Sequence, residues 1–286
     1  MTRHNAIYHF LLICFIALTA ALPAKGQIIN VPDESRINAD SVRRAFDRGP
    51  YFGLYKDNYF IFGTAVGPKP TRQNSNVKFQ ISIAQKLTRS TLPGGTYLYL
   101  YYTQKVFWNV LENSMPMTDL NFNPGLGLAK PLFSKGRYIG KVTFQIEHES
   151  NGRDSIWSRS WNKISLGANI IIDNNLMVHG KVWYPIVDGE NNRDILKYSG
   201  IYQIGTSILS NNRRWSGSVV LVKRKGWNLF NFNSIVEVAY RLTKSSNQFL
   251  FAQYYNGYGE GLLEYNKFHS QLRVGIVIKP ELFSDF

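Results

Sequence analysis

The feature that most constrains the fold is a two-residue alternation of apolar and polar side chains that recurs along most of the chain. In one run, Val77, Phe79, Ile81 and Ile83 alternate with polar residues, and similar runs occupy residues 96–108 and 271–279. Side chains two residues apart on a strand share a face, so each run predicts a strand with one apolar face. We count twelve such runs, which begin near Tyr51, Val77, Thr96, Asn123, Tyr138, Trp161, Leu176, Lys197, Arg214, Ser234, Gln248 and Phe268.

The N-terminus has the pattern of a secretory signal peptide. Arg3 precedes an apolar stretch at residues 10–22, and small residues follow it, which predicts cleavage after residue 26. A membrane-spanning helix needs about 20 apolar residues, and this stretch is shorter. Cys14 is the only cysteine, so the mature chain is expected to have none. The formal charge falls from +14 to +12 because Arg3 and Lys25 leave with the signal.

These properties together predict an all-β protein, a 12-stranded antiparallel transmembrane β-barrel of a bacterial outer membrane. The chain is rich in aromatic residues (14%), and no apolar helix is expected after Gln27. We assign residues 1–26 to the signal peptide, 27–50 to an irregular periplasmic arm and 51–286 to the barrel. Short and long connections alternate, which is typical of barrels with periplasmic turns and extracellular loops. The long loop at residues 151–160 would then face outward. A soluble β-sandwich would show a similar alternation and is the main rival for the fold.

The most informative polar residues lie at the ends of the fifth and sixth runs. His148 and Ser150 share one face of the fifth run with Ile146, and Asn162 shares a face with Ile164 in the sixth. All three therefore belong to rows that face lipid, where polar side chains are costly unless they lie at the interface or serve a function. Strand ends near headgroups do tolerate polar residues. A nucleophile (Ser150), a general base (His148) and an amide that orients the base (Asn162) nevertheless form a hydrolytic triad, and its outward position indicates a lipid ester as substrate.

Three blocks of sequence carry a resemblance to a known family. They are residues 102–124, which include PMTDLNFNP, residues 148–162 (HESNGRDSIWSRSWN) and residues 253–275, which begin with QYYNGYGEGLLEYN. The chain resembles the outer-membrane phospholipase A family over nearly all of its mature length. The resemblance implies hydrolysis of phospholipid acyl esters with A1, A2 and lysophospholipase activity. It also implies dependence on Ca²⁺ and activation as a homodimer in the outer membrane.

The resemblance assigns further roles residue by residue. It places calcium ligands at the backbone carbonyl of Arg153 and the hydroxyl of Ser158, with Ser114 contributed by the second subunit. Gln104 matches a polar position of the dimer interface. Two alternatives remain open, a non-catalytic channel or scaffold barrel and a lipopolysaccharide deacylase. The basic charge suits anionic headgroups, while export argues against nucleic acid as a partner.

Overall fold

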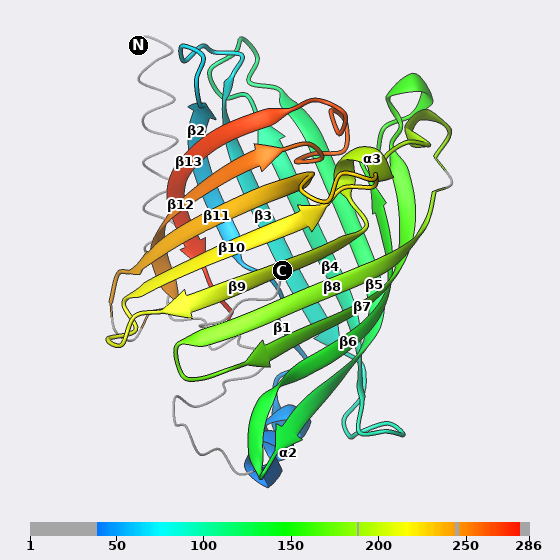
Figure 1. Cartoon of the computed structure of the whole chain (residues 1–286), viewed down its shortest axis with the longest axis vertical. Helices are drawn as coiled ribbons and strands as arrows, with labels where there is room; N and C mark the ends of the chain where they lie inside the picture. Colours follow the sequence, from blue (N-terminus) through cyan, green and yellow to red (C-terminus); the bar gives the residue numbers. More distant parts are fainter. Residues whose placement is uncertain (1–38, 188, 244–245, 281–286) are drawn as a thin grey trace.

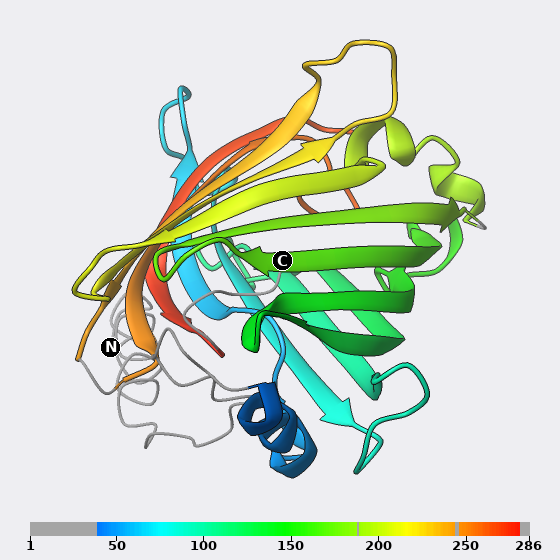
Figure 2. The same cartoon turned by 60° about the horizontal axis from the view of Figure 1, so that its bottom comes forward.

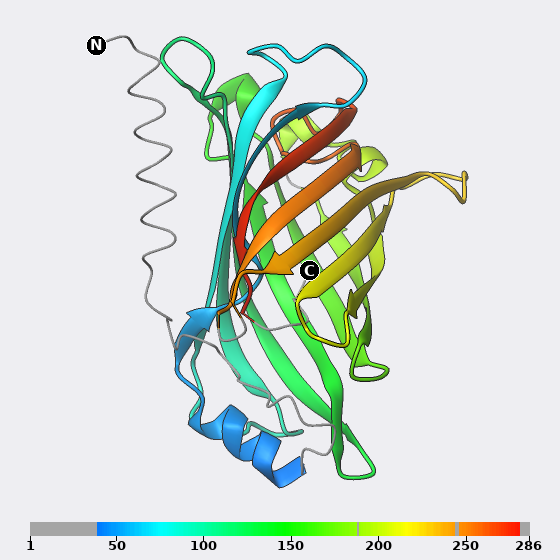
Figure 3. The same cartoon turned by 90° about the vertical axis from the view of Figure 1, so that its left-hand side faces the viewer.

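The structure is a computed structural model that describes residues 39–187, 189–243 and 246–280. Within these residues the chain forms a closed antiparallel barrel, seen from three directions in Figures 1, 2 and 3. From β2 onward each strand pairs with its neighbours in sequence, β1 pairs with β3, and β13 pairs with β2 to close the sheet. The helical segments are α2 (Ala39–Arg48), η1 (Ser155–Trp157), η2 (Glu190–Asn192) and α3 (Leu196–Ser199). The strands are β1 (Phe52–Leu54), β2 (Asn58–Ala65), β3 (Ser75–Lys86), β4 (Tyr97–Trp108), β5 (Met117–Ser134), β6 (Arg137–Ser150), β7 (Ser160–Ile171), β8 (Leu176–Ile186), β9 (Tyr202–Leu209), β10 (Trp215–Lys223), β11 (Phe232–Arg241), β12 (Gln248–Gly257) and β13 (His269–Ile278).

The barrel has twelve positions among the described residues because β1 and β2 occupy one position. Both segments pair with β3, with Leu54 opposite Ile83 and Tyr59 opposite Gln80. The predicted 12-stranded barrel is therefore confirmed, and the closed sheet excludes the soluble sandwich. No helix in the described part of the chain is long and apolar enough to cross a membrane.

The faces of the strands follow the predicted alternation. On β6, Ile146 is 55% exposed on the outer surface, while its neighbour Glu147 is 6% exposed and points into the barrel. On β4, Tyr97, Tyr99 and Tyr101 are all buried inside. Apolar side chains on the outer wall and polar or aromatic ones within are the arrangement of a membrane barrel.

The connections alternate in length as predicted with one exception, the long connection at residues 87–96 between β3 and β4, which lies at the same rim as the short turns. Turns at residues 135–136, 172–175 and 210–214 lie at one rim, together with α2. Loops at residues 66–74, 109–116, 151–159, 187–201, 224–231 and 258–268 lie at the other. We call the second the long-loop rim.

Two predicted boundaries and one predicted segment were wrong. The run placed near Lys197 begins instead at Tyr202, because Lys197 lies in α3. The strand expected near Asn123 begins six residues earlier, at Met117. The arm at residues 27–50 is not irregular throughout, since α2 occupies its last part. Residues 1–38, with the predicted signal peptide and Cys14, and residues 281–286, with Phe286, lie outside the described residues.

Helix α2 is stabilised by contacts with residues inside the barrel, which the sequence of residues 27–50 by itself does not indicate. Phe46 is buried against the ring of Tyr97, with 5.3 Å between ring centroids. The ammonium of Lys86 donates to the carbonyls of Phe46 at 2.6 Å, Asp47 at 3.1 Å and Gly49 at 3.2 Å. A cation at these last carbonyls stabilises the helix end.

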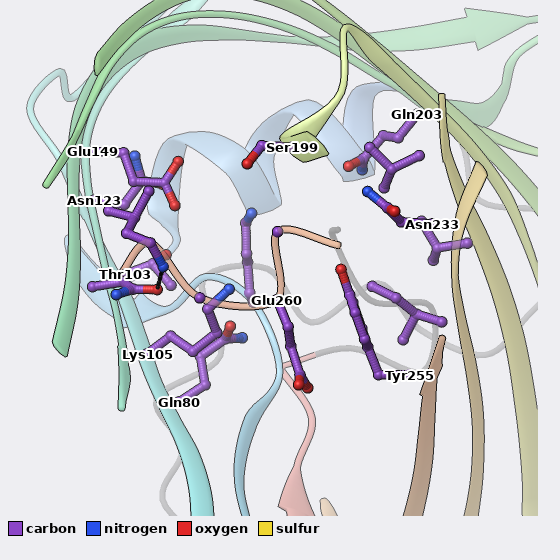
Figure 4. A pocket seen from close by; sticks show the side chains of 18 of the residues that line it. Gln80, Thr103, Lys105, Asn123, Glu149, Ser199, Gln203, Asn233, Tyr255 and Glu260 are labelled. Carbon is purple, nitrogen blue, oxygen red and sulfur yellow. Dashed lines mark hydrogen bonds between the residues drawn. The ribbon is translucent and has the colours of Figure 1, made fainter. Parts of the chain in front are cut away.

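Polar networks fill much of the interior. Glu260 from the 258–268 loop reaches into the barrel and pairs with Lys78 at 3.1 Å and Arg273 at 2.6 Å. Burial acts to raise the pKa of Glu260, but the charges of Lys78 and Arg273 outweigh it and lower the pKa to about 2. A cavity of about 260 Å³ remains among these polar side chains (Figure 4). The lumen is therefore narrow and largely filled by side chains, which contact the barrel wall from within.

Candidate active site

The register of β6 and β7 brings the three triad candidates together. His148 lies opposite Asn162, and Ser150 lies two residues further along β6, opposite Ser160. The His148 Nδ1 and Asn162 Oδ1 atoms are 2.9 Å apart. An amide oxygen can only accept, so this contact requires a proton on Nδ1 and leaves Nε2 as the basic nitrogen. The predicted contact between base and orienting amide is thus present.

The triad lies on the outer wall, at the long-loop rim. The residue before His148 on the same face is Ile146, and Ile186 lies opposite Asn162 on β8; both are exposed on the outer surface. His148, Ser150 and Asn162 are half-buried. A substrate can therefore approach these groups from the lipid side, near the level at which strands give way to loops.

Lumen-facing side chains support the triad strands from behind. The amide of Asn123 donates to the carbonyl of His148 at 2.8 Å. The carboxylate of Glu149 accepts from the indole of Trp161 at 3.0 Å and pairs with Lys163 at 2.9 Å. These bonds tie β5, β6 and β7 together at the height of the triad. Sequence reasoning had not assigned a role to any of these four residues.

The loop after Ser150 is organised around the buried side chain of Asn151. Its amide donates to the carbonyl of Trp157 at 2.9 Å, and its oxygen accepts from the backbone N–H of Arg159 at 2.9 Å. Gly152 has a φ of 63°, in the region that favours glycine, and a Cβ there would lie 2.9 Å from the ring of Phe122. The sharp turn beside the serine therefore depends on glycine and asparagine at these positions.

A second buried asparagine fixes the start of β7. Asn192 donates from its amide to the carbonyl of Ser160 at 2.9 Å and accepts from the N–H of Ser160 at 3.3 Å. Gly189 leaves space for it, since a Cβ at that position would lie 2.1 Å from the Asn192 oxygen. The neighbouring Asn191, which is exposed, donates to the carbonyl of Ser155 at 2.9 Å. The 187–201 loop thereby holds the 151–159 loop in place. The sequence carries only a weak signal for this role, a pair of asparagines in a glycine-containing loop.

The residues predicted to hold calcium lie in loops at this rim. Arg153 and Ser158 both belong to the 151–159 loop, and Ser114 is exposed in the 109–116 loop, where its φ is 66°. The guanidinium of Arg153 donates to the carbonyl of Thr118 at 2.7 Å, which links the 151–159 loop to the start of β5. Carbonyl and hydroxyl oxygens are ligands that Ca²⁺ accepts. Among the described residues no group of three His, Cys, Asp or Glu side chains could hold a metal. The donor set therefore fits a hard, weakly held cation and does not fit zinc.

Gln104 lies where the alternation predicts, on the lipid-facing row of β4. It is paired across the sheet with Ile81, which is exposed on the outer wall, and its amide oxygen accepts from the hydroxyl of Tyr102 at 3.1 Å. A polar pair on an apolar wall is costly in lipid unless it is covered.

A model of the family described as phospholipase A1 matches residues 55–278, which is nearly the whole barrel. The chain belongs to the phospholipase A1 family. The phospholipase A1 of Escherichia coli strain K12 is 32% identical over 251 residues, covering 80% of this chain and 81% of that protein. The phospholipase A1 of Klebsiella pneumoniae is 31% identical over 291 residues, covering 93% and 96%.

Solved structures agree with this assignment. Outer membrane phospholipase A from Escherichia coli superposes with a TM-score of 0.71 at 28% identity, covering 82% of this chain and 95% of that one. The Salmonella typhi outer membrane phospholipase, solved as a dimer with bound calcium, superposes with a TM-score of 0.70 at 29% identity, covering 81% and 93%. The resemblance of the sequence to the outer-membrane phospholipase A family is thus confirmed. This phospholipase is an outer-membrane barrel.

Proposed function

We propose that this phospholipase hydrolyses acyl esters of membrane phospholipids at either glycerol position, and of lysophospholipids, with Ser150 as its nucleophile. The observation that carries the proposal is the position of His148, Ser150 and Asn162, side by side on the lipid-facing wall at the long-loop rim. A site on that wall can receive an ester bond near the headgroup without the lipid leaving the membrane.

The proposed reaction follows from the chemistry of the three side chains. The Ser150 hydroxyl oxygen attacks the ester carbonyl carbon while His148 Nε2 takes its proton, and the Asn162 oxygen holds the ring through Nδ1–H. The bond to the glycerol oxygen then breaks, and His148 returns the proton to that oxygen. The fatty acyl group is now esterified to Ser150. Water, deprotonated by His148, attacks this ester and releases the fatty acid and the free serine.

Ca²⁺ is proposed as the cofactor, held by the carbonyl of Arg153 and the hydroxyl of Ser158, with Ser114 from a second subunit. When bound it would supply positive charge near the oxyanion that develops on the ester carbonyl. The loop fits this role because the side chain of Asn151 fixes its two ends and Gly152 turns the backbone toward the serine. The solved Salmonella typhi relative, a dimer with bound calcium, supports both parts of the proposal.

The homodimer and the orientation complete the proposal. Gln104 on the lipid-facing row of β4 and the exposed Ser114 in the loop after β4 both belong to the β4–β5 hairpin, so a second copy that packs on this hairpin would meet both. With short turns and α2 on the periplasmic side, the long-loop rim and the triad face the outer leaflet. The proposed substrate is therefore phospholipid in the outer leaflet.

The test is acyl release from phospholipid micelles by the native protein, by Ser150→Ala and by Ser160→Ala. Ser160 lies opposite Ser150 in the ladder, so it is a matched control for serine loss. We expect Ser150→Ala to lose activity by about 10⁴-fold or more and Ser160→Ala to keep most of it. Equal rates for native protein and Ser150→Ala would refute the nucleophile.

A sulfonyl fluoride gives an independent test of the base. The reagent should label Ser150 in the native protein and label it slowly in His148→Ala. Unchanged labelling in His148→Ala would refute His148 as the activating base. If the protein releases acyl chains as fast with a chelator as with Ca²⁺, the proposed cofactor is refuted.

A further inference from the structure

The loop between β10 and β11, residues 224–231, exposes three large apolar side chains in succession. Trp227 is 100% exposed, Leu229 74% and Phe230 88%. In Figure 3 this loop, drawn in yellow to gold, projects sideways from the barrel farther than its neighbours; Figure 2 shows it at the upper edge. Contiguous exposed apolar groups of this size mark a surface that is covered by something else.

The exposure is fixed by hydrogen bonds at the base of the loop. The ammonium of Lys223 donates to the carbonyl of Arg224 at 2.7 Å and also to the side-chain oxygen of Asn231. The side chain of Asn228 accepts from the N–H of Phe230 at 2.9 Å. The N–H of Lys225 donates to the carbonyl of Leu196 at 3.0 Å, so the loop is tied to α3. These bonds fix the backbone of the loop in a conformation in which its own residues do not bury the three apolar side chains.

The position of the loop separates it from the proposed dimer face. In the closed sheet β10 is six strand positions from β4 in either direction, so the loop lies across the barrel from Gln104. A second copy that covers Gln104 would leave this loop free. The loop shares the long-loop rim with η1, whose Ile156 and Trp157 are also exposed.

The surroundings of the loop indicate lipid as the cover. The wall below it is the lipid-facing row of β10 and β11, where Val219, Val236 and Val238 are exposed. A soluble protein cannot reach this wall, whereas the loop projects over the lipid that surrounds it. Tryptophan is enriched at membrane interfaces, phenylalanine and leucine insert into the apolar boundary below them, and the exposed Lys225 beside them suits phosphate groups.

We propose that the 224–231 loop is a lipid anchor, in which Trp227, Leu229 and Phe230 insert into the headgroup region of the leaflet at the long-loop rim. Together with the apolar η1 on the triad side, it fixes the depth and tilt of the barrel in that leaflet. Lys225 adds attraction to anionic headgroups. The proposal needs a membrane barrel but does not depend on how the ester is hydrolysed.

A single-thiol reporter tests the anchor. Cys14 is the only cysteine, so the full chain with Cys14→Ser and Leu229→Cys carries one thiol for an environment-sensitive fluorophore. The matched control is Gln73→Cys, an exposed polar site in the 66–74 loop of the same rim. Both proteins are placed in vesicles of diether phosphatidylcholine, which has no acyl ester to cleave, with and without diether phosphatidylglycerol.

We expect the fluorophore at position 229 to be quenched several-fold more by brominated lipid than the one at 73, and several-fold less by iodide in the water. The anchor is overturned if the two positions are equally open to iodide. It is also overturned if the fluorophore at position 229 is protected from iodide only at high protein density, and to the same extent in detergent. That outcome would mean that another protein molecule, and not lipid, covers the loop. Any additional quenching by brominated lipid in vesicles that contain phosphatidylglycerol should disappear when Lys225→Gln is added to the Leu229→Cys protein. If this quenching is unchanged, Lys225 does not attract anionic headgroups.

Discussion

Replacing Asn192 with alanine tests whether the proposed triad is positioned by a loop residue that lies 32 residues beyond Ser160, the residue it holds. Asn192 is fully buried and forms two hydrogen bonds, to the N–H and to the carbonyl of Ser160. Ser160 lies directly opposite Ser150 and two residues before Asn162. The alanine variant removes both bonds without touching a triad side chain.

The expected cost follows from the two backbone groups that lose their partner. A buried donor or acceptor left unsatisfied costs about 1–3 kcal/mol, so the pair costs about 2–6 kcal/mol if no water enters. The barrel wall is held by its ladders, so this energy should appear as local opening at the start of β7. A displacement of about 1 Å in a catalytic group can lower a rate by about 100-fold. We therefore expect kcat for Asn192→Ala to fall by about 10- to 100-fold.

The assay combines acyl release with amide hydrogen exchange at Ser160. The matched control is Asn191→Ala, the next residue, which is exposed and forms a single bond to Ser155. Asn192→Ala should accelerate exchange at Ser160 by more than 10-fold, and Asn191→Ala should change it only slightly. If both variants exchange and hydrolyse alike, the buried amide does not position the triad and the reasoning fails.

Four further results are expected. Glu260→Gln should lower the unfolding free energy by about 3–5 kcal/mol at neutral pH, because Lys78 and Arg273 lose their buried counter-charge; thermal unfolding checks this, and an unchanged midpoint would contradict it. Since the pKa of Glu260 is lowered from 4.5 to about 2, the free energy of unfolding should fall by about 3 kcal/mol as the pH is lowered from about 4.5 to about 2. Unfolding measured over this pH range should lack this contribution in Glu260→Gln. Gly152→Ala should slow acyl release, because a φ of 63° strains alanine by about 1–2 kcal/mol beside the proposed nucleophile. Gly136→Ala, with a φ of 75° at the opposite rim, is the control and should leave the rate unchanged. Similar rates for the two variants would argue against a local effect at Gly152. Removing Ca²⁺ with a chelator should lower the rate by about 100-fold while the barrel stays folded by circular dichroism, and its return should restore the rate.

The alternation of side chains was enough to predict the barrel and the face of each triad residue. A two-residue period leaves only one register in which the apolar row faces lipid. His148, Ser150 and Asn162 share parity with exposed apolar residues, so their outward position could be derived before any coordinates. Their membership of one site also followed, because antiparallel neighbours joined by a single loop must meet at that loop.

The supporting contacts could not be predicted in the same way. Asn192 acts on Ser160 through a loop 32 residues away, and Asn123 acts on His148 from another strand. Neither contact produces a repeating pattern in the sequence from which it could be predicted. Helix α2 was missed for a similar reason, since its stability depends on Tyr97 and Lys86 inside the barrel. The strand at Lys197 was misplaced because α3 also satisfies a short apolar pattern.

The position of the proposed triad gives a physical reason for an amide as its third member. Placing an ionised carboxylate in a poorly hydrated position costs several kcal/mol unless a cation pairs with it. On this wall Glu149 faces inward, where Lys163 neutralises it, while His148, Ser150 and Asn162 lie on the outward side of the same strands among apolar residues such as Ile146. Asn162 still fixes the ring of His148 through its oxygen at 2.9 Å, without adding a charge that lipid would penalise. In the proposed reaction the positive charge at the oxyanion would therefore come from the Ca²⁺ that we propose for the loop after Ser150.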